Sequence, residues 1–304
     1  MKNNLKEISE KIGFDAIGFA KVQELEKQFL NFENWIKQGF NANMNFFLRN
    51  KERRKNPILL FEKANTVIVF AKKYSVNFDF EQKIKIAKYA LQPDYHTTIK
   101  KLLNQFCEFL SKKYNSESFS FVDSGTILEK QWAVLAGIGW QGKNSLIINE
   151  NFGSFFNIGI ILTDLEIEPD FPVQNKCKNC QKCIEVCPTS AIVLPFTVDA
   201  NRCISYQTIE NKNEKPAEIK DAISKTNYVF GCDICQDICP FNQKFLDRKY
   251  NKLSVNSVLK NSNLLEISEN DFLELFENSA IKRAKYKNFM KNLEIVCKKQ
   301  DSVT

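Results

Sequence analysis

The chain has 304 residues, of which 43% are hydrophobic, and its 43 basic against 36 acidic residues give a formal net charge of +7. This length supports one large or two modest domains whose core needs no crosslinks, and no run reaches the roughly 18 apolar residues of a membrane span. The first residues are polar and carry no secretion signal, so we expect a cytoplasmic protein without a membrane partner, in which cysteines stay reduced. The mild positive charge permits a polyanionic partner without requiring one.

Helices alternate with strands over residues 1–168. Helices are predicted at residues 5–12, 23–37, 97–114 and 128–136, and strands at 16–19, 66–70, 119–122, 145–148 and 155–162. The clearest helix is 97–114, where Ile99, Leu103 and Phe106 recur at helical spacing. Residues 83–90 are too short and mixed in composition to assign. The alternation predicts a mixed α/β domain, of the α+β kind, for residues 1–168.

Two polar residues of this domain have competing interpretations. Asp123 ends an apolar strand, so partial burial could raise its pKa and let it donate a proton near neutral pH. The same Asp-Ser-Gly sequence is also good turn chemistry, and spacing alone favours that plainer interpretation. His96 is the single histidine of the chain. No histidine pair can therefore build a catalytic metal site, and a structural role is the simpler expectation for His96.

A glycine-rich turn runs from Gly137 to Asn144. It fits G-x-G-x-x-G and nearly fits the phosphate loop G-x-x-x-x-G-K-[ST], failing at Asn144. Both motifs need a strand before and a helix after, because the helix N-terminus holds the phosphate, and here the predicted order is reversed. We therefore reject nucleotide binding. We expect these glycines to let the backbone approach another ligand, with donors at the exit from Lys143, Asn144 and Ser145.

Eight of the ten cysteines lie within residues 169–245. The first four follow C-x2-C-x2-C-x3-C-P, in which three thiolates bind one [4Fe-4S] cluster and the fourth binds a neighbouring cluster. The second half keeps C-x2-C-x3-C-P but has its leading cysteine displaced to Cys203. Exchange of the fourth ligand predicts cluster one on Cys177, Cys180, Cys183 and Cys239, and cluster two on Cys203, Cys232, Cys235 and Cys187.

Two other kinds of cysteine site compete with this assignment. Cysteine pairs at x2 spacing also form zinc ribbons, and eight cysteines could form a disulfide framework in a secreted protein. A zinc site normally needs two pairs rather than a tight triplet followed by Cys-Pro, and no secretion signal is present. The iron-sulfur interpretation is therefore the stronger. The prolines after Cys187 and Cys239 are expected to stop the short helices that carry these cysteines.

Residues 246–304 are predicted to be helical and basic. Ser268 followed by Asp271 gives a weak helix-cap signal. Apolar residues at helical spacing predict one amphipathic helix over about residues 281–296 with a basic outer face. A second basic cluster comprises Arg49, Lys51, Arg53, Arg54 and Lys55. Such runs are usually solvated faces, and the alternative is a footprint for a phosphate backbone.

Several motifs in series resemble one enzyme family, over about residues 5–295. They are Asp94-Tyr95-His96, Val122-Asp123-Ser124-Gly125, Glu129, the run from Ala136 to Asn144, Gly153-Ser154, Leu162-Thr163-Asp164, the cysteine pattern, the run from Cys203 to Glu210 and the run from Gly231 to Gln236. Together they resemble epoxyqueuosine reductase, the cobalamin-dependent iron-sulfur enzyme of tRNA queuosine synthesis. The resemblance implies a nitroreductase-like cobalamin-binding domain (1–168), a ferredoxin-like domain with two [4Fe-4S] clusters (169–245) and a short basic helical segment (246–304).

The resemblance also implies roles for particular residues. Two clusters would pass single electrons to cobalamin, and Asp123 would donate the proton that lets the epoxide oxygen leave as water. Asp94, His96 and the donors at positions 143–145 would belong to the cobalamin pocket, whose cobalt takes no protein ligand. Candidate tRNA contacts are Lys282, Arg283 and Lys285. The expected partners are tRNA carrying epoxyqueuosine and a single-electron donor of flavodoxin or ferredoxin type, with the chain itself a monomer.

The chain departs from the family pattern at two positions. The family usually has Asp-Ser-Gly-Pro followed by Glu-Arg, whereas this chain has Thr126 and Lys130 at the proline and arginine positions. Lysine lacks the bidentate fork of arginine, so any carboxylate partner there is in doubt. Many relatives also carry a C-terminal helical-repeat domain that helps hold tRNA. This chain ends too soon for one, so we expect the basic segment and the main body to provide the tRNA affinity.

Two rival functions stay open on the sequence. A corrinoid iron-sulfur reductase of a small molecule, such as a reductive dehalogenase, would show no tRNA dependence and commonly carries an export signal. A ferredoxin-type electron carrier would leave the roughly 170 residues before the clusters unexplained.

Overall fold

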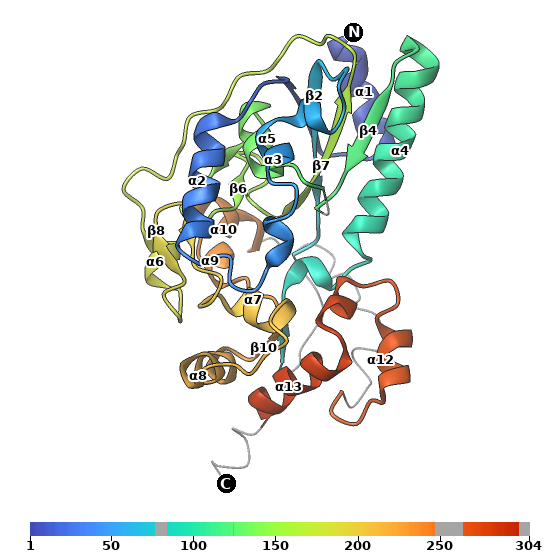
Figure 1. Cartoon of the computed structure of the whole chain (residues 1–304). Coiled ribbons are helices and arrows are strands. Elements are labelled where there is room, and N and C mark those ends of the chain that lie inside the picture. The colour runs from blue at the N-terminus through green and yellow to red at the C-terminus, as the bar shows by residue number, and fades with distance from the viewer. Residues whose placement is uncertain (77–83, 124, 247–263, 298–304) are drawn as a thin grey trace. The chain divides into compact units, whose positions relative to one another are not determined.

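The computed structural model describes residues 1–76, 84–123, 125–246 and 264–297 (Figure 1). These residues form two compact units. The first unit comprises Met1–Gly39, Asn45–Tyr74 and Tyr95–Cys180, and the second comprises Phe40–Met44, Ser75–Asp94 and Gln181–Thr304. The three-part division at residues 168 and 245 stays a prediction. None of the helices in the described ranges has the length and apolar run needed to traverse a bilayer.

A four-stranded antiparallel sheet forms the centre of the first unit. Its order is β1-β2-β7-β4, and the four strands are β1 (Ala16–Lys21), β2 (Thr66–Lys73), β7 (Phe156–Thr163) and β4 (Ser118–Phe121). The long central pair is in register with Val67 opposite Leu162 and Val69 opposite Ile160. These strands are rich in β-branched residues buried on both faces, which is why the sheet carries helices on both sides.

Alternate residues of the central strands enter two separate cores. On one face, Ile68 and Phe70 pack with Phe106 of α4 (Tyr95–Tyr114) and with Leu5 of α1 (Lys2–Ile12). On the other face, Val67, Val69, Ile160 and Leu162 pack with Trp132 of α5 (Glu129–Leu135). Figure 1 shows α1 and α4 on one side of the sheet and α5 on the other. The mixed helix and sheet fold predicted for this part of the chain is confirmed.

Most predicted elements of the first unit are present, with ends shifted by a few residues. The helix predicted from residue 23 begins later, as α2 (Glu26–Lys37), and Pro57 opens the short helix η2 (Pro57–Leu59). Between them lie η1 (Asn45–Phe47) and α3 (Glu52–Lys55). The glycine-rich run forms a hairpin of two very short strands, β5 (Trp140–Gln141) and β6 (Ile147–Ile148). The sequence predicts only the second of these strands, because the apolar run at 146–148 indicates a strand, whereas β5 lies within the glycine-rich run.

Short helices and loops make up the second unit. The helices are α6 (Lys182–Glu185), α7 (Ile204–Ile209), α8 (Ala217–Thr226), α9 (Ile234–Asp237) and α10 (Pro240–Leu246), and the strands are β3 (Lys85–Ile86), β8 (Ile192–Leu194), β9 (Thr197–Val198) and β10 (Tyr228–Phe230). Parallel pairing of β10 with β3 ties the segment around residue 85 to this unit. Pro188 and Pro240 do not end helices that carry Cys187 and Cys239, because α6 ends at Glu185 and α9 ends at Asp237. Pro240 instead opens α10, since proline suits the first helical position.

The C-terminal segment corrects one prediction. Residues 281–296 do not form a single helix: η4 (Ala280–Ala284) ends at Lys285, whose φ is 63°, and α13 (Tyr286–Cys297) follows. The apolar positions still point inward, so their spacing could not reveal the break. The weak signal at Ser268 is confirmed, because Ser268 and Asp271 form a complete capping box at the start of α12 (Glu269–Leu275).

Candidate active site and cluster ligands

Asp123 lies at the exit of β4, and two ring side chains from the start of α4 contact its carboxyl group. The Tyr95 hydroxyl donates to Asp123 Oδ2 at 2.9 Å, and His96 Nε2 lies 3.1 Å from the same oxygen. The two rings are 4.0 Å apart between centroids. The Asp123 side chain stays 47% exposed. The structure thus brings Asp123 and His96 together at one accessible carboxyl group.

Tyr95 is a site residue that sequence reasoning missed. It stands in the motif Asp94-Tyr95-His96, yet a tyrosine at the start of a helix carries no spacing signal for contact with a loop 28 residues away. Its hydroxyl can donate to a carboxylate or accept from a carboxylic acid. Tyr95 can therefore accompany Asp123 in either protonation state.

Glu129 accepts a hydrogen bond from the backbone of Asp123. The backbone N–H of Asp123 donates to Glu129 Oε1 at 2.6 Å, and this bond accompanies the left-handed φ of 52° at Asp123, a conformation that aspartate tolerates better than most residues. Burial, and then the neighbouring Asp123 carboxylate, raise the pKa of Glu129 to about 8. Glu129 is therefore largely a neutral acid at pH 7, and it adds little negative charge beside Asp123.

Arg54 is a buried cation in the same neighbourhood. It is 6% exposed, and its guanidinium donates to the carbonyls of Gly125 at 3.5 Å and Phe46 at 3.4 Å. The same group lies over the Phe47 ring at 5.3 Å. Burial lowers the pKa of Arg54, and the nearby Glu129 raises it. Arg54 thus fastens the loop after Asp123.

This burial corrects one interpretation of the basic cluster at positions 49–55. Besides Arg54, Lys51 pairs with Glu33 at 2.6 Å, and Lys55 pairs with Glu24 and Glu26 at 3.0 and 2.8 Å. Three of its five cations therefore serve contacts inside the protein. A phosphate footprint across the whole cluster is not supported.

The glycine-rich turn is explained by the packing of the protein itself. Gly137 has a φ of 69°, and a Cβ there would lie 2.7 Å from the Phe171 carbonyl oxygen. At Gly139 a Cβ would lie 2.2 Å from the Ile148 carbonyl oxygen across the hairpin. Neighbouring backbone therefore requires glycine at these two positions, and the approach of a ligand to this turn stays a prediction.

The donors that follow this turn already have protein partners. Lys143 Nζ donates to the Lys178 carbonyl at 2.8 Å, and the buried Asn144 side chain accepts from Leu146 N–H at 3.3 Å. Ser145 adopts a φ of 64°. Asp94, in the second unit, donates its backbone N–H to the Asn278 carbonyl at 2.8 Å. The cofactor role of these four residues stays a prediction.

Four of the predicted cluster ligands meet in the second unit. Burial, and after it the charges of Cys203 and Cys187, raise the pKa of the Cys232 thiol. Burial likewise raises the pKa of Cys235, followed by the charges of Cys232, Cys203, Cys187 and Cys183, the last of which is predicted for cluster one. Cys187, Cys203, Cys232 and Cys235 therefore interact electrostatically, although Cys203 and Cys232 are far apart in the sequence. They are the four residues predicted for cluster two.

Further contacts suit these cysteines to an iron-sulfur cluster. The backbone N–H of Ala191 donates to Cys187 Sγ at 3.2 Å, a kind of bond that tunes clusters. Within the described ranges, no three His, Cys, Asp or Glu side chains are arranged to hold a single metal ion. Of the cluster-one residues, Cys239 is buried and Cys180 is exposed.

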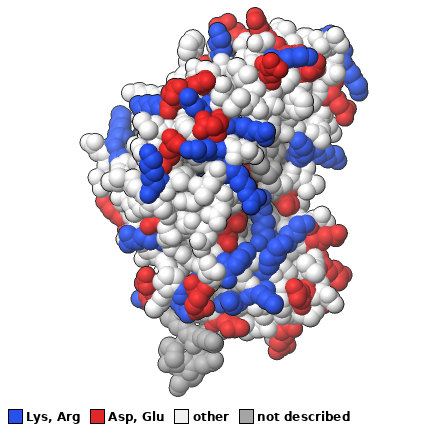
Figure 2. All heavy atoms as spheres, viewed as in Figure 1, with Lys and Arg blue, Asp and Glu red and all other residues white. Residues whose placement is uncertain are grey.

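The candidate tRNA contacts lie around η4. Lys282 and Lys285 are exposed, and Arg283 is partly exposed. Lys212 Nζ donates to the carbonyls of Arg283 and Ala284 at 3.1 and 3.0 Å, which fixes the end of η4. Figure 2 shows Lys and Arg side chains spread over this face of the molecule and interspersed with Asp and Glu side chains. Lys298 and Lys299 lie outside the described residues.

Comparisons with known proteins agree over most of the chain. Residues 54–124 match the family model "Epoxyqueuosine reductase QueG", and residues 176–242 match the model of a 4Fe-4S double cluster binding domain. The epoxyqueuosine reductase of Cyclobacterium marinum is 36% identical over 96% of this chain and 95% of its own length, and that of Cellulophaga algicola is 36% identical over 94% of each.

Two solved structures share the fold. An epoxyqueuosine reductase with an epoxyqueuosine-modified tRNA stem loop matches with a TM-score of 0.87 and 27% identity, covering 97% of this chain and 80% of that one. A Bacillus subtilis epoxyqueuosine reductase with its catalytic aspartate loop swung out of the active site matches with a TM-score of 0.86 and 27% identity, at the same coverage.

Proposed function

Because the chain belongs to the epoxyqueuosine reductase family, we propose that it reduces epoxyqueuosine to queuosine at the wobble position of tRNA, the last step of queuosine biosynthesis. The observation that carries this proposal is 36% identity to a curated relative along 95% of that relative's length. The exposed carboxyl group of Asp123 supports it, because epoxide removal needs an accessible acid. The reaction consumes two electrons and two protons and releases the oxygen as water.

Asp123 is the proton donor in this proposal. An alkoxide is a poor leaving group, so protonation of the epoxide oxygen lowers the barrier to its departure. Tyr95 and His96 contact the same Asp123 oxygen and hold it, while Glu129 fixes the backbone of Asp123. Substrate binding around an acid prearranged in this way avoids the cost of orienting it during the reaction.

Cobalamin is the proposed redox group, and it supplies a strongly nucleophilic reduced cobalt when bound. The residues around Asp123 would hold this group beside the proton donor, and His96, the single histidine, whose Nε2 lies 3.1 Å from Asp123 Oδ2, would belong to that pocket. The pocket wall is assigned to Asp94, His96, Lys143, Asn144 and Ser145. The Lys143 ammonium donates to the Lys178 carbonyl. Lys143 is therefore assigned to the wall of the pocket for its placement there, and its ammonium is not assigned a contact with the cofactor.

Two [4Fe-4S] clusters supply the electrons, in keeping with the matched double-cluster model. Cluster two is assigned to Cys187, Cys203, Cys232 and Cys235, which interact electrostatically, and cluster one to Cys177, Cys180, Cys183 and Cys239. An external donor of flavodoxin or ferredoxin type would reduce them. We place the enzyme in the cytoplasm as a monomer, with Lys282, Arg283 and Lys285 contacting tRNA.

The direct test is turnover on defined substrates. Anaerobically prepared protein, with cobalamin and a chemical single-electron donor, is incubated with an anticodon stem loop carrying epoxyqueuosine, and the nucleosides are separated after digestion. The proposal predicts queuosine as the product. A small-molecule reductase would instead dehalogenate a halogenated phenol and leave the stem loop unchanged, and a simple electron carrier would bind no cobalt and turn over neither substrate.

A further inference from the structure

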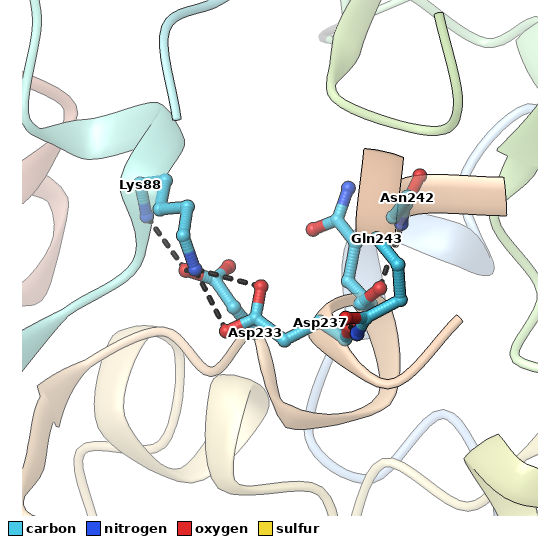
Figure 3. A network of polar contacts seen from close by, with 6 residues as sticks. Lys88, Asp233, Asp237, Asn242 and Gln243 are labelled. Atoms are coloured by element: carbon cyan, nitrogen blue, oxygen red, sulfur yellow. Dashed lines mark hydrogen bonds and ion pairs between the residues drawn. The ribbon is translucent and has the colours of Figure 1, made fainter. Parts of the chain in front are cut away.

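A lysine of the second unit bridges two aspartates in the loop that carries three cluster cysteines (Figure 3). Lys88, the first residue of η3 (Lys88–Ala90), places Nζ 2.7 Å from both carboxyl oxygens of Asp237 and 3.5 Å from Asp233 Oδ2. Its backbone N–H also donates to Asp233 Oδ2, at 2.8 Å. Lys88 therefore makes charged contacts with both aspartates and a backbone contact with one of them.

Both aspartates are embedded in the cysteine motif. Asp233 stands between Cys232 and Cys235, and Asp237 is two residues before Cys239. Asp233 is 3% exposed as a residue, and the Lys88 side chain is 18% exposed. The Asp237 side chain is 35% exposed, so the Lys88–Asp237 pair is partly shielded from water, and its charges are screened less than those of a fully exposed pair.

The other side of the same loop is held by amide side chains. Asn242, fully buried, donates from Nδ2 to the Gln236 carbonyl at 2.7 Å, and Gln243 donates to the Asp237 carbonyl. Figure 3 shows Lys88 approaching the aspartates from one side, with Asn242 and Gln243 on the other. Lys88 therefore holds the Asp237 carboxylate, while Asn242 and Gln243 hold the backbone at positions 236 and 237.

We propose that Lys88 is a positioning residue that sets the reduction potential of the cluster bound by Cys232 and Cys235, by balancing the carboxylate of Asp237 beside it. This inference rests on the proposed cluster assignment. A cluster gains one negative charge when it accepts an electron, and the net charge of its surroundings shifts its potential. A fixed cation therefore favours the reduced cluster, and a fixed carboxylate disfavours it.

The proposal predicts opposite shifts for the two halves of the pair. Lys88→Gln leaves Asp237 uncompensated and should make the cluster harder to reduce, whereas Asp237→Asn leaves the cation and should make it easier. We expect about a tenfold change in the reduction equilibrium in each case, which is about 59 mV for a one-electron couple. The double variant should return close to the wild-type potential, because both charges are removed together.

The competing role for Lys88 is purely structural, in which it only holds the loop in place. In that case removal of Lys88 would loosen the loop without an ordered change of potential. Lys88→Arg keeps the charge and should leave the potential nearly unchanged. Lys85→Gln is the matched control: this lysine lies three residues earlier in the same segment, is exposed, and contacts the Tyr228 ring instead of an aspartate. It should shift the potential far less than Lys88→Gln.

The experiment is a redox titration of the anaerobically purified full-length variants, followed by electron paramagnetic resonance, with iron and sulfide measured on each sample. Opposite shifts for Lys88→Gln and Asp237→Asn that cancel in the double variant support the proposal. An unchanged potential in Asp237→Asn with full iron content overturns it, whatever Lys88→Gln does. Loss of about half the iron in Lys88→Gln, with no shift in Asp237→Asn, makes Lys88 a tether. Wild-type protein without iron or sulfide would instead contradict the cluster assignment itself.

Discussion

A single carboxyl group carries the proposed chemistry at the scale of the residue. Asp123→Asn preserves the size and most hydrogen bonds of the side chain but removes its proton. We expect this variant to keep iron, sulfide and cobalamin while its turnover falls by about 10²–10⁴-fold, the usual contribution of a general acid. Asp221→Asn is a suitable control, because Asp221 is an exposed aspartate of α8 whose carboxylate pairs with Lys225 one helical turn later. Unimpaired turnover in Asp123→Asn would remove the proton-donor role.

Glu129 predicts a particular dependence of stability on pH. Its pKa is raised from 4.5 to about 8 in the folded protein, so the folded state binds more protons than the unfolded state between these values. Stability therefore falls as pH rises through this window, with a limiting slope on the order of 1.4 kcal/mol per pH unit, and levels off above about pH 8.

Glu129→Gln tests this linkage. Glutamine can still accept the Asp123 N–H but cannot ionise, so the variant should lose less stability than wild type between about pH 5 and 8. The measurement is the thermal unfolding midpoint across that range, with Glu108→Gln on the exposed face of α4 as control. Parallel curves for wild type and Glu129→Gln would show that the acid is not protonated in the fold.

The residue scale also shows where sequence reasoning stops. Asp123 is identified through its family motif, whereas spacing alone favours a plain turn. The burial of Arg54 is not predictable, because a basic run normally indicates a solvated face and only the fold reveals the carbonyls of Phe46 and Gly125 that receive it. The contact of Tyr95 with Asp123 is not predictable either, because the two residues are 28 positions apart in the sequence and only the fold brings them together.

Two glycines offer a matched test at the scale of the element. Gly137 and Gly39 have nearly equal φ values of 69° and 70°, yet a Cβ at Gly137 would lie 2.7 Å from the Phe171 carbonyl oxygen, and a Cβ at Gly39 would meet nothing within 4 Å. Gly39→Ala should cost only the backbone strain of about 1–2 kcal/mol. Gly137→Ala should cost clearly more, because the backbone of residue 171 must move.

Chemical denaturation of both alanine variants measures this difference in unfolding free energy. Equal losses at the two positions would mean that the close approach of residue 171 contributes nothing. A larger loss at Gly39 than at Gly137 would contradict the packing explanation of the glycine-rich turn.

Elements are predictable where their periodicity is long. The 20-residue helix α4 and the two 8-residue strands β2 and β7 follow from their apolar patterns. The break at Lys285 is not predictable, because lysine rarely adopts the left-handed conformation and its neighbours keep an inward-facing pattern across the break. Strand β5 is not predicted because it lies within a glycine-rich run without an apolar pattern, whereas the equally short β6 belongs to an apolar run.

At the scale of the whole molecule, the net charge of +7 becomes meaningful through its distribution. If the exposed cations around η4 contact tRNA phosphates, the triple change Lys282→Ala, Arg283→Ala and Lys285→Ala should weaken binding. The dependence of log K on log salt should also become shallower, by about one unit for each phosphate that the variant no longer neutralises. Binding of the epoxyqueuosine stem loop at several salt concentrations measures this slope.

A control for this slope is a triple change on α1, at Lys2, Lys6 and Lys11, which removes equal charge from the first unit. An equal reduction of the slope in both triple variants would indicate general electrostatic attraction and no contact site at η4. An unchanged slope in the η4 variant would place the tRNA elsewhere on the protein.

The cysteine pattern predicts the ligands of both clusters. The structure adds that Cys203 interacts electrostatically with Cys232 and Cys235, which lie far from it in the sequence. The most direct test of this account is the content of iron, acid-labile sulfide, cobalt and zinc in protein purified without oxygen and supplied with cobalamin. Two [4Fe-4S] clusters predict about eight iron and eight sulfide per chain, together with one cobalt. Protein that holds zinc and no sulfide would contradict the account.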